Sequence, residues 1–326
     1  MIFHYGLRLL CLCLASFFLV NAAAGLTTAF ASRALLRMAE TMRPRCAARL
    51  LFAARVLPWA LGAGAVLALC LPSYLWLEPQ ASSEQIGWAC LALALWGAAV
   101  CFGSVRRVAR ALAASVRFNR AWQQSGSETL LPGELSKAVI VKKDAPLLAL
   151  VGVFRQRLVV SQTVLSSLST EQLELALHHE NAHRISRDNL KRLFLLLAPA
   201  PIPFLPGFSS LEKCWAQFSE WAADDEAVRG DSQRALSLAA AILRVARMGA
   251  APSLSFLHTS LCAGDHDLSR RVDRLLRIQP VPAKPLSPAR CLAIGSSLGI
   301  AVSIAVLLAW PATLSSVHRL LELLLR

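Results

Sequence analysis

The residues best suited to chemistry form the run His179-Glu180-Asn181-Ala182-His183. Its two histidines are four positions apart, so on a helix both imidazoles emerge from one face, about one turn apart. This spacing lets two ring nitrogens bind one zinc ion at about 2.0–2.1 Å. Glu180 is offset by one residue, which suits it to reach a water on the ion rather than the ion itself. The run predicts zinc-assisted hydrolysis with Glu180 as the general base.

A catalytic zinc site needs a third protein ligand and one open position. Glu220 and Asp224 are four residues apart on a second predicted helix, at about 211–230. We expect Glu220 to complete a set of two histidines and one glutamate. Asp224, one turn further on, would accept the free ring N–H of a zinc-binding histidine and fix its tautomer.

Other polar residues near these motifs are secondary candidates. Asp188 follows His183 by five residues, and it could brace the first helix through Arg184 or Arg187. Two downstream residues are candidate donors to the developing oxyanion: His266 and Arg271. For His266 the alternative is an ordinary loop histidine.

Local patterns indicate the elements that must position these residues. Ser169 and Gln172 form a capping box that opens the helix of the first motif. Upstream, three short apolar runs predict strands at 138–141, 147–154 and 158–161. A loop precedes them, marked by Gly126, Pro132 and Gly133. A substrate strand could pair with the edge of this small sheet, near 147–161.

The composition places much of the chain in a membrane. Hydrophobic residues make up 56% and charged residues 17%, whereas soluble proteins have about 45–50% and about 25%. Four apolar stretches reach the roughly 20 residues that cross a bilayer: 9–31, 56–77, 86–105 and 291–310. The nine cysteines form no CxxC pair, and most lie in or beside apolar runs, so we expect free thiols that act as small apolar side chains.

The positions of the basic residues predict the orientation. Arginines gather after the first and third apolar stretches, whereas the loop after the second has Glu78 and Glu84 and no Lys or Arg. Positive loops stay in the cytoplasm, so we expect the N-terminus outside and residues 106–290 inside. This distribution accounts for much of the formal charge of +14 without nucleic acid. A basic helix is expected at about 105–123.

We therefore expect four parts in the chain. They are a three-span domain at 1–105, a cytoplasmic domain at 106–290, a fourth span at 291–310 and a short amphipathic external tail at 311–326. Segment 193–208 is apolar and contains four prolines. A single crossing there would separate Glu220 from His179 by the membrane, so it either re-enters and returns or packs as an apolar loop. Ala29-Phe30-Ala31 resembles a leader cleavage site, but the basic segment after it opposes export, so we expect the first span to be retained.

The HExxH run, an aspartate five residues later and the ExxxD pair resemble gluzincin-type integral membrane metallopeptidases. They resemble in particular the antirepressor, or signal-transducer, peptidases of β-lactam-sensing systems. Segments 158–173 and 271–276 are similar too. The resemblance covers roughly residues 1–310 and is specific over about 158–230. It implies about four transmembrane helices with a cytoplasmic α+β gluzincin-like zinc peptidase domain, here lacking the C-terminal penicillin-binding sensor.

The resemblance also implies a function: regulated cleavage of a cytoplasmic transcriptional repressor, in the bacterial inner membrane, with the sensor supplied by a separate protein. One alternative is quality control of membrane proteins, which needs a site that opens to the lipid bilayer. Another is a signalling scaffold that keeps zinc for structure, but such a site has no need of Glu180. Direct binding of nucleic acid is not expected, because the basic residues lie in membrane-proximal loops without a recognition motif.

Overall fold

The computed structural model describes residues 2–77, 87–129, 138–141, 147–198, 200, 207–248, 259–260, 265–277, 315–316 and 319–320. Two of the predicted parts, the fourth span at 291–310 and nearly all of the external tail, lie outside these residues. The described part is mostly helical, with one small mixed sheet.

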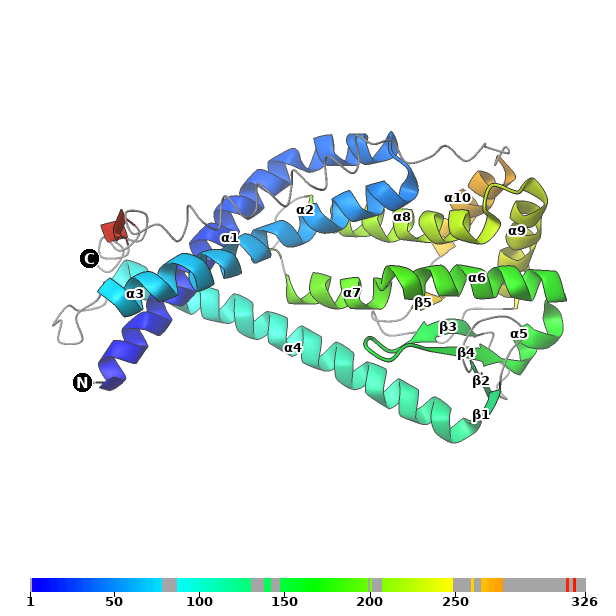
Figure 1. Ribbon diagram of the computed structural model, residues 1–326, viewed down its shortest axis with the longest axis horizontal. Coiled ribbons are helices and arrows are strands. Elements are labelled where there is room, and N and C mark those ends of the chain that lie inside the picture. The colour runs from blue at the N-terminus through cyan, green and yellow to red at the C-terminus, as the bar shows by residue number, and fades with distance from the viewer. Residues whose placement is uncertain are drawn as a thin grey trace.

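Three helical stretches of the described chain are long and apolar enough to cross a membrane: Tyr5–Glu40, Pro44–Leu77 and Trp88–Ala121. They belong to α1 (Ile2–Glu40), to α2 (Pro44–Ala65) with its continuation through the π-helical turn η1 (Val66–Cys70) and α3 (Leu71–Leu77), and to α4 (Trp88–Ser125). Three of the four predicted apolar stretches lie on these helices. The helices form the elongated end of the molecule that carries the N-terminus (Figure 1).

Glycines bring the membrane helices close together. A Cβ added to Gly97 of α4 would clash with the carbonyl oxygen of Leu14 on α1. One added to Gly62 of α2 would lie 3.0 Å from the carbonyl oxygen of Phe17. Small residues at such crossings let helix backbones approach within a membrane, where packing drives association. Helix α1 is therefore held between α2 and α4.

The basic helix expected at 105–123 is not a separate element. Helix α4 runs without interruption from Trp88 to Ser125, so the same helix carries the third apolar stretch and the arginines after it. The change from apolar to basic residues gives the sequence a boundary, but no proline lies there and the helix continues through Gly103 and Ser104.

The sheet has five strands in the order β1-β2-β4-β3-β5. Strands β2 (Ala138–Val141) and β4 (Arg157–Ser161) pair in parallel, and the other pairs are antiparallel. Strand β3 (Leu148–Val151) is shorter than the predicted run 147–154, because Gly152 has a positive φ of 98° and begins a turn. The three central strands are therefore those that the sequence predicts.

The two outer strands were not predicted. Strand β1 (Gly126–Thr129) begins at a glycine that we expected in a loop, and β5 (Thr259–Ser260) comes from a distant part of the chain. The expected pairing edge near 147–161 is also wrong for much of its length. Strand β4 is internal, and β3 already pairs with β5 at Ala149 and Leu150.

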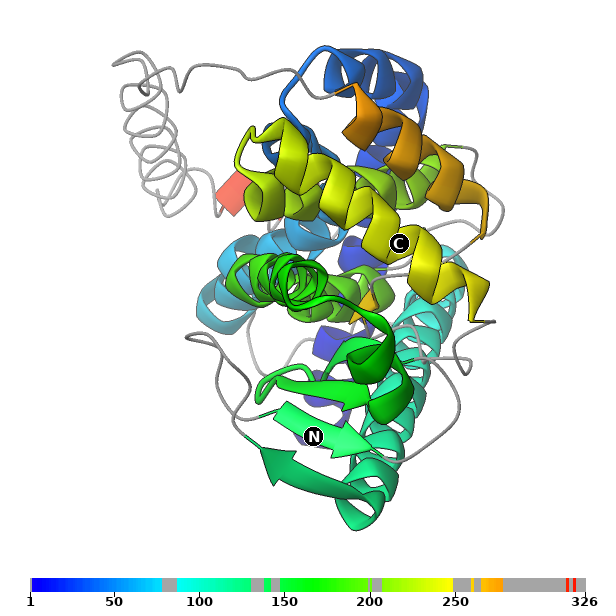
Figure 2. The same cartoon turned by 90° about the vertical axis from the view of Figure 1, so that its right-hand side faces the viewer.

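In the described part of the chain, six helices accompany the sheet: α5 (Gln162–Ser167), α6 (Thr170–Ser186), α7 (Asp188–Leu197), α8 (Phe208–Val228), α9 (Ser232–Arg247) and α10 (Asp265–Leu276). The capping box of Ser169 and Gln172 is confirmed at the start of α6. Arg187 adopts the left-handed conformation, φ 55°, between α6 and α7. Both views show α6 between the sheet and α8, with the α1–α2 hairpin on the other side of α8 (Figures 1 and 2).

Helix α8 packs directly on the α1–α2 hairpin. Leu211, Trp215 and Phe218 of α8 form one buried cluster with residues of the hairpin: Ala39, Ala47, Ala48 and Leu51. The buried guanidinium of Arg55 on α2 donates to the carbonyl oxygen of Ala198 and to the carboxylate of Glu212. The apolar segment 193–208 begins as the last turn of α7, and its four prolines lie outside the described residues.

Candidate metal centre

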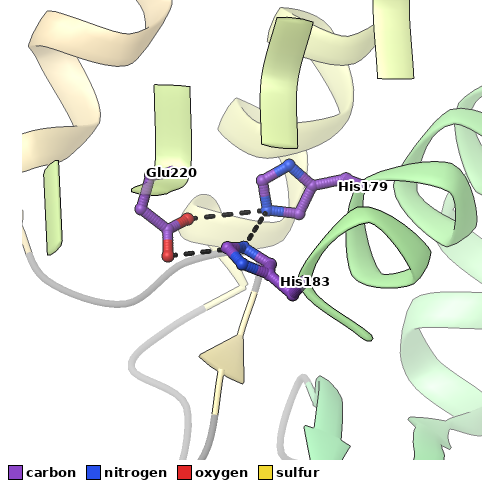
Figure 3. Close-up of side chains that lie close together, drawn as sticks. All are labelled: His179, His183 and Glu220. Carbon is purple, nitrogen blue, oxygen red and sulfur yellow. Dashed lines mark hydrogen bonds and ion pairs between the residues drawn. The ribbon is translucent and has the colours of Figure 1, made fainter. Parts of the chain in front are cut away.

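Three side chains from two facing helices converge at one point. His179 and His183 lie one turn apart on α6, and Glu220 lies on α8 (Figure 3). The Nε2 atoms of the histidines are 3.2 Å apart, and each is 3.5 Å from a carboxylate oxygen of Glu220. The expected pair of histidines and the expected glutamate are thus brought together.

These distances suit a tetrahedral ion. Ligand atoms about 2.05 Å from a tetrahedral zinc lie roughly 3.3 Å from one another. The observed separations of 3.2 and 3.5 Å lie on either side of that value. Two histidines and one glutamate, with a fourth position open, are also a donor set of catalytic zinc sites.

The contacts of the two Nδ1 atoms explain why the two Nε2 atoms are free to bind a metal ion. Nδ1 of His179 lies 2.9 Å from Asp224, and Nδ1 of His183 lies 2.7 Å from Asp188. Ionised carboxylates only accept, so Nδ1 of each ring is the nitrogen that carries the proton. Both Nε2 atoms then point to one place, 3.2 Å apart, where the lone pairs of the deprotonated nitrogens can bind one cation. The residues present fit a metal ion.

The surroundings of Glu180 differ from those of the three converging residues and suit a group that accepts a proton. Its side chain is fully buried beside the two histidines, and neither carboxylate oxygen has a hydrogen-bond partner among the described residues. Burial raises the pKa of Glu180, although the neighbouring histidines oppose the change. A buried, unpartnered carboxylate is costly to maintain, which fits a group that receives a proton rather than one that holds the fold together.

The charges of the site are strongly coupled. Burial lowers the pKa of His183, but Glu220 and the hydrogen bond to Asp188 outweigh it and raise the pKa to about 10. The pKa of His179 is raised as well: burial lowers it, but Asp224 and Glu220 outweigh burial. Burial would raise the pKa of Glu220, but the charges of His183 and Arg271 hold it well below its usual value. The carboxylates of the site therefore shift both imidazoles toward their protonated form.

The expected role of Asp188 needs correction. We expected it to brace the helix through Arg184 or Arg187, but its close contacts are to His183, to Lys191 Nζ at 2.7 Å and to Ser219 Oγ at 2.8 Å. Arg187, in the left-handed conformation, ends α6 and starts α7. Asp188 is the first residue of α7, and there its carboxylate contacts the ring of His183.

The contacts of Arg271 are with carboxylates of the site, and the role of oxyanion donor stays a prediction. Arg271 is buried, and it donates to both carboxylate oxygens of Asp224, at 2.7 and 3.0 Å. Its remaining nitrogen lies 3.1 Å from Glu220. The guanidinium therefore positions two carboxylates of the site. His266 lies on α10, and its side chain is outside the described residues.

Three residues of the surrounding network were missed by the sequence reasoning. Ser219 and Lys191 both contact Asp188. Asn189 donates its amide to the carbonyl oxygens of Leu150 and Gly152, at 3.0 and 2.8 Å, and so ties α7 to the end of β3. Each is within three residues of a motif residue, which is the only sequence signal they carry.

Comparison with known proteins gives one result. A family model described as "BlaR1 peptidase M56" matches residues 65–275, nearly two-thirds of the chain. The match contains every residue of the candidate metal centre. No curated protein gives a significant match.

Proposed function

The chain belongs to the BlaR1 peptidase M56 family of membrane metallopeptidases, and we propose that it is a zinc endopeptidase of regulated proteolysis. The observation that carries this proposal is the pairing of two groups in one buried site. A converging set of His179, His183 and Glu220 stands beside the unpartnered carboxylate of Glu180. The set supplies metal ligands, and Glu180 supplies a base.

Each residue then has a distinct role in peptide hydrolysis. A zinc ion held by the three ligands would polarise the scissile carbonyl and lower the pKa of a water molecule. Glu180 accepts the proton of the attacking water and returns it to the departing amine. Asp188 and Asp224 hold the imidazoles in one tautomer and orientation. Arg271 keeps the carboxylates of Glu220 and Asp224 ionised and in place.

The preferred substrate is a cytoplasmic transcriptional repressor, and a separate protein would sense the signal. Family membership supports this role, because the antirepressor peptidases that the sequence resembles act in signalling. The arginine-rich segments after the first and third apolar stretches support a domain at 106–290 on the cytoplasmic side of the bacterial inner membrane. We propose the expected division, 1–105, 106–290, 291–310 and 311–326, on the same grounds.

One observation favours quality control of membrane proteins as a second candidate. Helix α7, which begins at Asp188 of the metal site, packs against α2 and α4, two of the helices that are apolar enough to cross a membrane. Near its end Phe194 is 39% exposed. A membrane segment could reach the site along this apolar helix.

The test compares protein N-termini in cells that contain the wild-type chain or the Glu180→Gln variant. We expect one or two cuts in a cytoplasmic DNA-binding protein that depend on Glu180, with a loss of roughly 100- to 10,000-fold in cleavage rate. The purified variant should keep its metal. Glu174→Gln is the matched control, because Glu174 lies on the same helix with its side chain 63% exposed.

The outcomes separate the candidates. Many Glu180-dependent cuts across membrane proteins would favour quality control over signalling. Equal cleavage by wild type and Glu180→Gln, in cells exposed to the inducing signal, would reject the peptidase mechanism. A chain that keeps zinc but cuts nothing under those conditions would be the scaffold.

A further inference from the structure

The N-terminal part of α1 lies beside α3 at the end of the molecule away from α6 and α8 (Figure 1). A second cluster of reactive side chains lies on these membrane helices. Cys13 of α1 and Cys70 of η1 have sulfur atoms 3.8 Å apart. Cys11 and Cys90 belong to the same buried apolar cluster. Four of the nine cysteines thus gather in one small volume, although they are spread widely along the sequence.

The local backbone aims Cys70 at its partner. Cys70 is the last residue of η1, a five-residue π-helical turn between α2 and α3. A π-turn accommodates one extra residue and so rotates the following side chains relative to an unbroken α-helix. Such turns are frequent at functional sites. Cys70 is only 2% exposed, so its thiol faces the helix interface and not the surroundings.

A pair of tyrosines holds the two helical segments together beside these thiols. The rings of Tyr5 on α1 and Tyr74 on α3 lie 4.8 Å apart, centroid to centroid. Each hydroxyl donates to the backbone carbonyl of the other residue, at 3.5 and 3.4 Å. Because these contacts join α1 to the segment that carries Cys70, the two sulfurs are kept as neighbours.

We propose that Cys13 and Cys70 are a redox-active dithiol that is oxidised to a disulfide within the membrane part of the protein. The sulfurs would close from 3.8 Å to about 2.05 Å. Both S–H bonds break and one S–S bond forms. The two electrons and two protons pass to a quinone, which becomes a hydroquinone. A quinone is the fitting oxidant because the thiols lie on apolar helices, where a lipid-soluble molecule reaches the partly buried Cys13.

The bond would cross-link two segments that are far apart in sequence. It joins α1 to the end of the α2–η1 helix and so prevents the two from sliding past each other. Helices α1 and α2 also pack on α8 at their other end, through the cluster of Ala47, Leu51 and Trp215. The oxidation state of the pair would therefore affect the position of the α1–α2 hairpin, on which α8 packs. Formation of the disulfide does not depend on the proposed peptidase function.

The test counts free thiols in the full-length protein in lipid nanodiscs. The protein is treated with a short-chain, fully substituted benzoquinone, which has no free ring carbon to which a thiol can add. It is then denatured and labelled with a polyethylene glycol maleimide. We expect the wild-type chain to lose two of its nine reactive thiols and to regain both after reduction. Mass spectrometry of the digest should find the Cys13 peptide joined to the Cys70 peptide.

Variants make the assignment specific. Neither Cys13→Ala nor Cys70→Ala should lose thiols on treatment with the quinone. The comparison requires only that one of these two variants folds. Cys101→Ala is the matched control, because Cys101 also lies on a membrane helix, and it should still lose two thiols. An unchanged thiol count in the oxidised wild type would overturn the proposal. An equal loss in Cys13→Ala, or a cross-link mapped to another pair, would do the same.

Discussion

At the scale of single residues, the metal centre depends on carboxylates that do not bind the metal. Asp188 and Asp224 each accept from one imidazole, and Ser219 and Arg271 in turn hold these two aspartates. This arrangement decides which nitrogen of each ring faces the centre. The ligands are therefore oriented before any ion arrives.

Replacing Asp188 by alanine should weaken metal binding. Without its acceptor, His183 is free to change tautomer and rotate, and we expect a loss of about 10- to 100-fold in metal affinity. Competition with a chromophoric chelator would measure it in purified full-length protein. Asp225→Ala is the control, since its carboxylate faces Arg274 on the outer side of α8. Equal affinities in Asp188→Ala and the wild type would contradict the role of Asp188.

Metal affinity should rise with pH. The pKa values of His179 and His183 lie above their usual value, and that of His183 lies at about 10, so the ring of His183 holds an extra proton at neutral pH in the metal-free site. Binding must expel this proton, which contributes roughly a tenfold gain in affinity per pH unit. Chelator competition at pH 6, 7 and 8 should show affinity increasing throughout. His178→Ala should keep the same slope, because His178 lies outside the site, and a flat profile would refute the proton competition.

At the scale of elements, α8 takes part in both the candidate metal centre and the packing of the membrane helices. One face carries Glu220 and Asp224, and the opposite face packs on the α1–α2 hairpin. Arg55 fixes the start of this helix through Glu212, and its guanidinium lies 4.7 Å from the ring centroid of Phe208. Glu212 is two turns before Glu220, so the contact with α2 sets where the metal ligand sits along the helix.

Removing Glu212 should destabilise the protein markedly. The side chain of Arg55 is 5% exposed and that of Glu212 34%. Glu212→Ala leaves a buried cation without its partner, at a cost of roughly 3 kcal/mol in the free energy of unfolding. Thermal unfolding in detergent would measure the loss. Glu226→Ala removes an exposed ion pair with Arg45 and should cost about 0–1 kcal/mol. Equal effects of the two variants would show that the buried pair does not hold α8.

The elements that the sequence predicts well are those with local signals. The capping box marks the start of α6, and the HExxH spacing brings its two histidines to one face. Strand β5 has only two residues, and its place depends on pairing with β3, about 110 residues earlier. The contacts of Arg271 with Asp224 and Glu220 likewise join distant segments. Local spacing identifies ligands, whereas long-range packing decides what supports them.

At the scale of the whole molecule, the helices expected to cross the membrane also complete the core of the catalytic half. The buried state of Leu211 and Trp215 on α8 comes from packing against α1 and α2. The two parts share this core cluster, which is separate from the cluster that packs α6 and α9 against the sheet.

Deleting residues 1–77 should therefore disable the peptidase domain even though every motif residue remains. The exposed face of α8 would cause aggregation, and the displaced Glu220 would no longer retain the metal. Metal content and light scattering of the purified protein would show both effects. The control is the full-length chain cut at a protease site inserted within 78–86, which keeps the hairpin in place and should keep its metal. A soluble, metal-loaded chain without residues 1–77 would contradict the shared core.

The unbroken α4 has a mechanical consequence. Its 38 residues make a rod about 57 Å long, whereas the hydrocarbon core of a bilayer is about 30 Å thick. The far end meets β1 and β2, and Phe118 packs under the sheet. Helices tilt to match bilayer thickness, and a change of roughly 5° would carry the end of such a rod about 5 Å sideways. A change in bilayer thickness would thus displace the sheet, which lies beside the helix that carries His179 and His183.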